Sequence, residues 1–252
     1  MRIAREDRVR MERAHVLAWP SLSTAMIDGW LWRSSGGGSQ RANSVSTIDF
    51  QRADLNASVA HAESRYHALG QPTRFQTFDE TSPSNLPETL QNRGYKRSES
   101  TTTMFKRIER VATPDDTEAR DHPWPEWQSV YLGEITENRR AINTLILDRI
   151  PSPRAFFGCR RNGEIIATAL CVLGFGCAVI ECVTTRADRR RQGAAQSVLT
   201  ALETGAAQKN ADWIGLQVVS TKTQAVALYE PLGLRCRCNQ QFQGSLTPWF
   251  LL

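Results

Sequence analysis

The segment from Glu181 to Ala195 constrains this chain more than any other part of it. It reads as a short buried strand, passes through three consecutive arginines (189–191) and enters a helix that starts with small residues. The region from Ala194 to Gln208 has its apolar residues on one side, as an amphipathic helix requires. Because the first N–H groups of a helix lack partners and the helix dipole is positive there, this end predicts a site for a diphosphate. The alternative is an ordinary helix preceded by a solvated basic loop.

A second pattern follows toward the C-terminus. A β-rich run (Trp213–Val219) precedes a helical run (Thr223–Tyr229), and Gly233 suits the left-handed conformation that ends a helix. Together the two segments resemble motifs A and B of the GNAT superfamily, the acetyl-CoA-dependent N-acyltransferases. The matching residues are Arg190, Gly193 and Ala195 in motif A, and Leu216, Val218, Ala225, Leu228, Tyr229 and Gly233 in motif B. Lys222 and Leu234 depart from the pattern, which usually has asparagine and phenylalanine there.

The remaining elements of the second half follow the same order. The patterns predict helices at 127–134, 139–150, 194–208 and 223–229, and strands at 154–160, 165–173, 178–184, 213–219 and 235–243. The resemblance implies an α/β (α+β) protein with the GNAT fold, in which helices flank a mixed, mostly antiparallel sheet.

The first half repeats this order in a weaker form. Strands are predicted at 30–33, 44–48 and 73–78, and helices at 54–69 and 86–93. Val45 precedes Val183 by 138 residues, and Gly94 precedes Gly233 by 139. Such a constant spacing indicates a duplicated unit.

The first copy lacks the residues that the resemblance assigns to catalysis. Its helix opens with an acidic residue, Asp54, which would repel a phosphate, and Leu90 stands where the second copy has Tyr229. We therefore expect two pseudo-repeated lobes, a degenerate N-terminal lobe (1–115) and a catalytic lobe (116–252). The charged, proline-containing segment 110–124 is the expected linker.

Composition and charge narrow the possible partners. The chain has 252 residues, a net charge of +5 and a pI near 9.1. No basic stripe interleaved with aromatic residues occurs, so we expect no nucleic-acid partner. The six cysteines show no metal-binding spacing, so no metal is expected.

One long apolar stretch and the N-terminal segment indicate whether the protein enters a membrane or is secreted. Residues 165–180 are uncharged and apolar, but Gly174-Phe175-Gly176 interrupts them as a turn, so a buried hairpin is favoured over a membrane span. The charged residues 1–13 lack the apolar core of a signal peptide. We expect a cytoplasmic monomer or homodimer that does not enter a membrane.

The GNAT resemblance implies where acetyl-CoA, or coenzyme A, would bind. In that family the central strand diverges from its neighbour, and the pantetheine arm lies in the gap. Carried over, that strand holds Cys182, Val183 and Thr184, and a backbone N–H near Val183 would polarise the thioester carbonyl. The backbone from Arg190 and Arg191 through Gln192, Gly193, Ala194 and Ala195 would hold the diphosphate. Lys222 would point either to the cofactor phosphates or to solvent.

The implied catalytic residues are less uniform. Tyr229, with an ordinary phenol pKa near 10, is the candidate general acid toward the departing thiolate. Gln217 occupies a place where some family members have a glutamate, so Glu181 is the candidate general base, unless the amine arrives neutral and needs none. Trp127 and Tyr131, four apart on one helix, are expected either to line the acceptor pocket or to be core residues.

Three functions remain open on this reading. The first is an acetyl-CoA-dependent N-acetyltransferase that acts on a primary amine of a small molecule or peptide. The second is a non-catalytic acyl-CoA sensor. The third is a scaffold in which the motif A resemblance is accidental. The identity of the acceptor amine cannot be read from the sequence.

Overall fold

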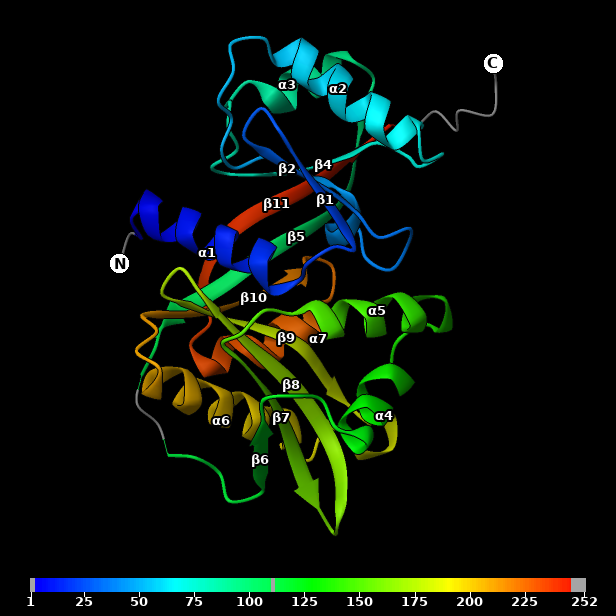
Figure 1. Cartoon of the computed structure of the whole chain (residues 1–252). Helices are drawn as coiled ribbons and strands as arrows, with labels where there is room; N and C mark the ends of the chain where they lie inside the picture. Colours follow the sequence, from blue (N-terminus) through cyan, green and yellow to red (C-terminus); the bar gives the residue numbers. More distant parts are fainter. Residues whose placement is uncertain (1–2, 110–111, 246–252) are drawn as a thin grey trace.

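A computed structural model describes residues 3–109 and 112–245. Within these ranges, eleven strands form one sheet in the order β1-β2-β3-β4-β11-β5-β10-β9-β8-β7-β6 (Figure 1). The strands are β1 (Ser23–Ile27), β2 (Trp30–Ser34), β3 (Val45–Ser46), β4 (Arg74–Phe78), β5 (Lys96–Arg107), β6 (Thr117–Arg120), β7 (Arg154–Arg161), β8 (Glu164–Gly174), β9 (Cys177–Thr185), β10 (Trp213–Val219) and β11 (Cys236–Gly244). The α-helices are α1 (Arg5–Ala18), α2 (Leu55–His67), α3 (Leu86–Asn92), α4 (Pro125–Gly133), α5 (Glu137–Arg149), α6 (Ala194–Gln208) and α7 (Thr223–Tyr229). Short 3₁₀ turns are η1 (Arg41–Asn43), η2 (Ala187–Arg189) and η3 (Glu230–Leu232).

The two halves of the chain exchange strands at the centre of this sheet. β5, from the first half, pairs antiparallel with β10 of the second half, and β11, from the second half, pairs antiparallel with β4 of the first. β5 and β11 also pair with each other. In Figure 1 they run side by side through the middle of the molecule. The halves therefore share one continuous hydrogen-bonded sheet.

The repeat predicted from the sequence is visible on both sides of this centre. β3 and β4 are parallel, as are β9 and β10, and a helix (α2 or α6) follows the first strand of each pair. All other pairings are antiparallel, which confirms the mixed, mostly antiparallel sheet. β3 is shorter than predicted. Its parallel ladder stops at Ser46, and the Thr47 hydroxyl donates to the carbonyl of Gln76 at 2.9 Å.

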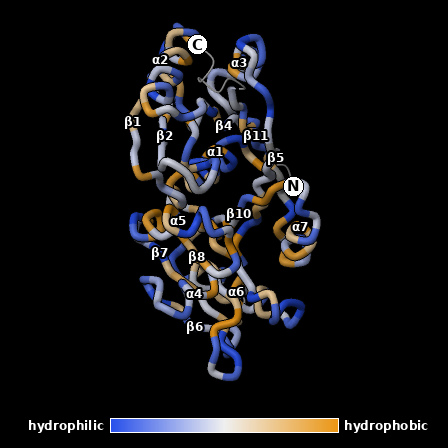
Figure 2. The backbone as a smooth tube through the Cα atoms, turned by 90° about the vertical axis from the view of Figure 1, so that its right-hand side faces the viewer, coloured by the Kyte–Doolittle hydropathy of each residue, from blue (hydrophilic) through white to orange (hydrophobic). Residues whose placement is uncertain are grey.

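Two apolar layers enclose the second half of the sheet. On one face, α6 and α7 pack against β8–β10 through residues such as Val198, Leu202 and Leu216. On the other face, α1, α4 and α5 pack through Met11, Trp127 and Ile146. Figure 2 shows hydrophobic residues gathered along these strands and α6, with hydrophilic residues at the loop tips. No helix in the described part of the chain is both long and apolar enough to cross a bilayer.

Four elements were not predicted. α1 lies where the sequence showed only a charged N-terminus, yet it contacts β8, β9 and β10 of the second half. β1 pairs with β2 in the first half, and β5 is the central strand described above. β6 lies inside the predicted linker, where Thr117 to Arg120 pair with β7, so the part of the linker beginning at Thr117 is an edge strand. The division near residue 115 stays a prediction.

The hairpin predicted in place of a membrane span is present. β8 and β9 are antiparallel neighbours, and Gly174 pairs with Cys177 across the turn. Phe175 and Gly176 both have positive φ angles, 54° and 71°, as a two-residue hairpin turn requires.

Candidate active site

The candidate site begins where two parallel strands separate. β9 and β10 pair only through Cys177–Val179 and Trp213–Gly215. Beyond this point β9 stays paired with β8, and β10 stays paired with β5. Backbone groups on the facing edges of both strands are therefore left without a ladder partner, as the GNAT resemblance implied.

A β-bulge lies in β9 beside this gap. Register pairs join Leu170 to Glu181 and Thr168 to Thr184, so Cys182 and Val183 together face the single residue Ala169 of β8. Cys182 adopts a positive φ of 55°, which is uncommon for a non-glycine residue. A bulge of this kind bends the strand and redirects its side chains, and such bulges are frequent at active sites.

The strand leads into a loop that presents free backbone amides. Gly193 caps α6 with a φ of 81°, and the first amide bonded into the helix is that of Ser197, which donates to the Gly193 carbonyl. The amides from Gly193 to Gln196 make no backbone hydrogen bond in the described structure. A Cβ added at Gly193 would meet no protein atom within 4 Å. The backbone amides at the N-terminus of α6 are thus unpaired and uncovered, as binding of a diphosphate requires.

The arginines of this loop differ in their availability. Arg190 donates to Glu134 at 2.6 Å, and Arg189 is paired with Glu164 and Asp188. Arg191 is exposed and has no hydrogen bond or ion pair with another described residue. It is the arginine that can turn to an anion without breaking an existing contact.

Tyr229 lies at the end of α7, within the apolar layer under α6. Its side chain is 8 % exposed, and its hydroxyl makes no hydrogen bond to another described residue. Burial, and secondarily the charge of Glu181, raises the pKa of Tyr229 to about 12. The phenol is therefore protonated at neutral pH and free to donate.

Comparison with known proteins places this geometry in a family. The family described as "Probable histone acetyltransferase Rv0428c C-terminal" matches residues 7–242. The chain belongs to this family. Uncharacterized N-acetyltransferase YobR of Bacillus subtilis (strain 168) is 25 % identical over 237 residues, which are 90 % of this chain and 94 % of that protein.

Solved GNAT structures share the fold over nearly the whole chain. A GCN5-related N-acetyltransferase from Kribbella flavida superposes with a TM-score of 0.69 at 14 % identity and 95 % coverage of each chain. A tandem GNAT protein from the clavulanic acid biosynthesis pathway gives 0.65 at 11 % identity, covering 96 % of this chain and 95 % of that one. The protein is an acyltransferase of the GNAT superfamily, and the predicted GNAT fold is confirmed.

In this acetyltransferase the candidate base is already engaged. Both oxygens of Glu181 accept hydrogen bonds from Arg41 of η1, at 2.6 and 2.8 Å. Arg41 also donates to the Gln217 side chain at 3.4 Å. Glu181 is buried rather than an exposed strand-end carboxylate, and its assignment as a base stays a prediction.

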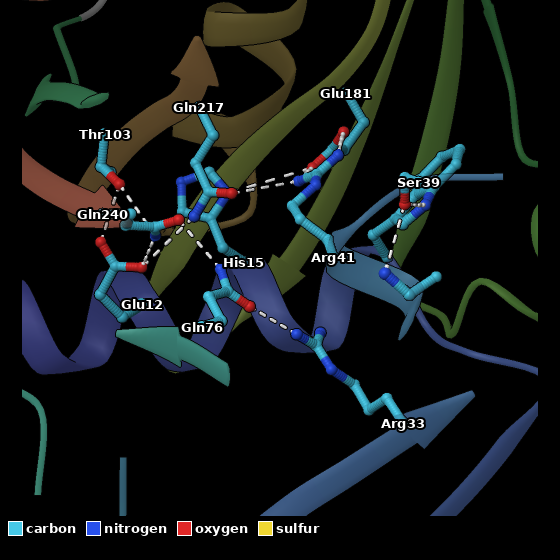
Figure 3. Close-up of polar contacts among 12 residues, drawn as sticks. Glu12, His15, Arg33, Ser39, Arg41, Gln76, Thr103, Glu181, Gln217 and Gln240 are labelled. Atoms are coloured by element: carbon cyan, nitrogen blue, oxygen red, sulfur yellow. Dashed lines mark hydrogen bonds and ion pairs between the residues drawn. The ribbon is translucent and has the colours of Figure 1, made fainter. Parts of the chain in front are cut away.

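A set of buried and half-buried polar side chains continues from this ion pair and is drawn in Figure 3. We call it the central polar cluster: Glu12, His15, Arg41, Thr103, Glu181, Gln217 and Gln240. Glu12 of α1 accepts hydrogen bonds from Thr103 at 2.7 Å, from Gln217 at 3.3 Å and from Gln240. The cluster joins α1, η1, β5, β9, β10 and β11, so it crosses both halves. Only the two polar residues within the apolar side of α1, Glu12 and His15, could have signalled it in the sequence.

The burial of Glu12 predicts a pH-dependent stability. Desolvation raises its pKa from 4.5 to about 7, against the hydrogen bonds from Thr103 and Gln240. Between these pH values the folded state binds more protons than the unfolded state, so the free energy of unfolding falls as the pH rises. This loss is complete above pH ~7, and it amounts to about 3 kcal/mol for one such carboxyl.

Glu12→Gln should abolish this dependence. We expect its free energy of unfolding, relative to the parent, to rise by about 3 kcal/mol between pH 4.5 and 8, measured by urea denaturation. Glu6→Gln, at an exposed position of the same helix, is the matched control for the loss of one carboxylate. A parent-to-variant difference that is the same at both pH values would show that Glu12 is not responsible.

Of the remaining predicted site residues, two are buried near the bulge and one is exposed. Tyr131 is buried, accepts a hydrogen bond from Asn143 at 2.9 Å and lies against the Cys182 thiol, so it is close to the bulge. Trp127 is fully buried, and its indole N–H donates to the Phe157 carbonyl. Its ring packs against that of Tyr131, with the centroids 5.4 Å apart. Lys222 precedes α7 and is exposed.

Proposed function

We propose that this protein is an acetyl-CoA-dependent N-acetyltransferase in which a primary amine attacks the thioester directly. One observation carries the proposal: β9 and β10 separate beside a bulge, and the same strand leads to the open amides of α6. A gap with unpaired strand edges suits the pantetheine arm, and the amides from Gly193 suit the diphosphate.

The chain's own residues divide the remaining work. Bound acetyl-CoA supplies an activated acetyl thioester. A backbone N–H near Val183, outside the β8 ladder, would polarise its carbonyl, and Arg191 would add a charge at the phosphates. Tyr229 would donate its hydrogen toward the departing sulfur.

The start of α2, which corresponds in the first half to the start of α6, is not open to a phosphate. At the start of α2, the carboxylate of Asp54 already accepts a hydrogen bond from the Ala57 amide at 3.0 Å. That carboxylate occupies the position in which a phosphate would bind, and its negative charge would repel the phosphate. We propose that one acetyl-CoA binds per chain, in the second half.

Calorimetry and a thiol-release assay test the function. Titration with acetyl-CoA should saturate at one equivalent. The acceptor is then sought with kanamycin, spermidine, free amino acids and a lysine-rich histone-tail peptide, the last suggested by the description of the matched family. Thiol release matched by acetylation of one amine, detected by mass spectrometry, supports the proposal. Binding without release by any amine favours the acyl-CoA sensor, and no binding rejects both.

A further inference from the structure

His15 is the least satisfied polar side chain in the central polar cluster. It lies on α1 with 2 % exposure, and neither ring nitrogen has a hydrogen-bond partner among the described residues. Buried polar groups are nearly always hydrogen-bonded, and an exception calls for an explanation such as a catalytic role or a bound water or ion. A neutral imidazole has one N–H and one lone pair, and both are unused here.

His15 is also placed beside the bulge. Its Nδ1 is 4.0 Å from Oε1 of Glu181, the residue immediately before Cys182 (Figure 3). Arg41 donates a hydrogen bond to each oxygen of that carboxylate and so fixes its position. The imidazole therefore lies beside the carboxylate of the residue that directly precedes the bulge.

The two faces of the sheet separate His15 from Tyr229. α1 packs with the layer that contains Cys182 and Tyr131, whereas Tyr229 packs with the layer under α6. A thioester held in the gap between β9 and β10 would thus meet a proton donor on one face and an unpartnered base on the other. This is the arrangement that acyl transfer needs, because the amine loses a proton while the sulfur gains one.

We propose that His15 accepts the proton of the acceptor amine, so that the first half of the chain supplies the catalytic base of the second half. This assignment rests on the proposed function. As the C–N bond forms, one proton passes from the amine nitrogen to an imidazole nitrogen. The C–S bond breaks, and the sulfur leaves as a thiolate beside the Tyr229 hydroxyl. Once the products have left, His15 loses its proton to water and the thiolate takes one up from water, so that one proton has passed in net from nitrogen to sulfur.

The charged groups around His15 fit this cycle. Glu12 lies on its own helix, Arg41 faces it from η1 and Glu181 faces it from β9. Burial, followed by the charge of Arg41, lowers the pKa of His15 well below its usual value, so the ring is neutral before the amine arrives. The same shift weakens the ring as a base, and the Glu181 carboxylate that faces it offsets this by stabilising the imidazolium. Once protonated, the imidazolium faces the Glu181 carboxylate, which thereby positions the base rather than serving as one.

The test compares histidine variants in the thiol-release assay, with acetyl-CoA and each amine of the panel above. For His15→Gln we expect kcat to fall on the order of 10²-fold, with the Kd for acetyl-CoA unchanged. His61→Gln, on the exposed side of α2, should match the parent. In His15→Ala, added imidazole should restore thiol release, and among substituted imidazoles the restored rate should increase with their basicity.

Each other outcome counts against the assignment. An unchanged kcat in His15→Gln overturns it. A loss of rate that imidazole does not restore, accompanied by weaker acetyl-CoA binding or earlier thermal unfolding, means that His15 has a structural role only. No thiol release from the unaltered protein overturns the proposed function, and this assignment with it.

Discussion

Replacing Tyr229 by phenylalanine should lower kcat by about 10²- to 10³-fold and leave the Kd for acetyl-CoA unchanged. The substitution removes only the hydroxyl, which has no partner among the described residues, so no internal hydrogen bond is lost. Loss of the hydroxyl raises the activation barrier, because the hydroxyl stabilises the negative charge that develops on the sulfur. The apolar surroundings strengthen that interaction, because water does not compete there.

The raised pKa of Tyr229 refines the role expected from the sequence. A phenol near 10 could pass its proton readily to a thiolate, whereas one near 12 holds it more firmly. Hydrogen-bond donation to the sulfur is then the larger contribution. The rate should not fall through ionisation of this phenol at any pH below about 10.

Steady-state thiol release together with calorimetry checks this prediction. Tyr95→Phe is the matched control, because it removes one hydroxyl that bonds Glu63 in the first half, away from the site. It should leave kcat unchanged. If Tyr229→Phe turned over as fast as the parent, Tyr229 would be a core residue with no part in the reaction.

The parts of the fold that the sequence predicted are those in which pattern and contact are local. The helix from Ala194 to Gln208 and the strand around Leu216 each bury one side in a uniform apolar layer. Their apolar residues therefore recur at the regular spacing of a helix or a strand. Both GNAT motifs lie within such segments, so the candidate diphosphate loop and the candidate acid Tyr229 could be proposed from residue types alone.

The parts that were missed depend on contacts between distant segments. β5 is central, yet its middle is Thr101-Thr102-Thr103, because part of it faces the central polar cluster instead of an apolar layer. The exchange of β5 and β11 cannot be read from either strand, since each pairs with the other half of the chain. α1 was missed because its apolar side is interrupted by Glu12 and His15.

The same reasoning explains what the sequence showed of the candidate site. Glu181 was singled out by its place on β9, but its partner Arg41 is 140 residues earlier in the chain. No spacing rule joins two such residues. The first half was judged degenerate because it lacks a phosphate motif, whereas the structure shows that its η1 and α1 reach the second half. A lobe without its own site can still contribute to its neighbour's.

Replacing Gly193 by aspartate should weaken acetyl-CoA binding by more than about 100-fold. The residue has a φ of 81°, and its Cβ direction is open, so a side chain there would enter the space in front of the α6 amides. A carboxylate would occupy that space and repel the diphosphate. A repulsion of about 3 kcal/mol between close charges near a protein surface is sufficient for this loss.

Gly94→Asp separates this effect from backbone strain. Gly94 follows α3 in the first half, has a φ of 84° and likewise has no atom within 4 Å of an added Cβ. Aspartate tolerates this left-handed region better than most residues, so both variants should fold with a similar small loss of thermal stability. Calorimetry should then show parent-like affinity for Gly94→Asp and little or no binding for Gly193→Asp. Equal affinities in the two variants would mean that the diphosphate does not bind at the start of α6.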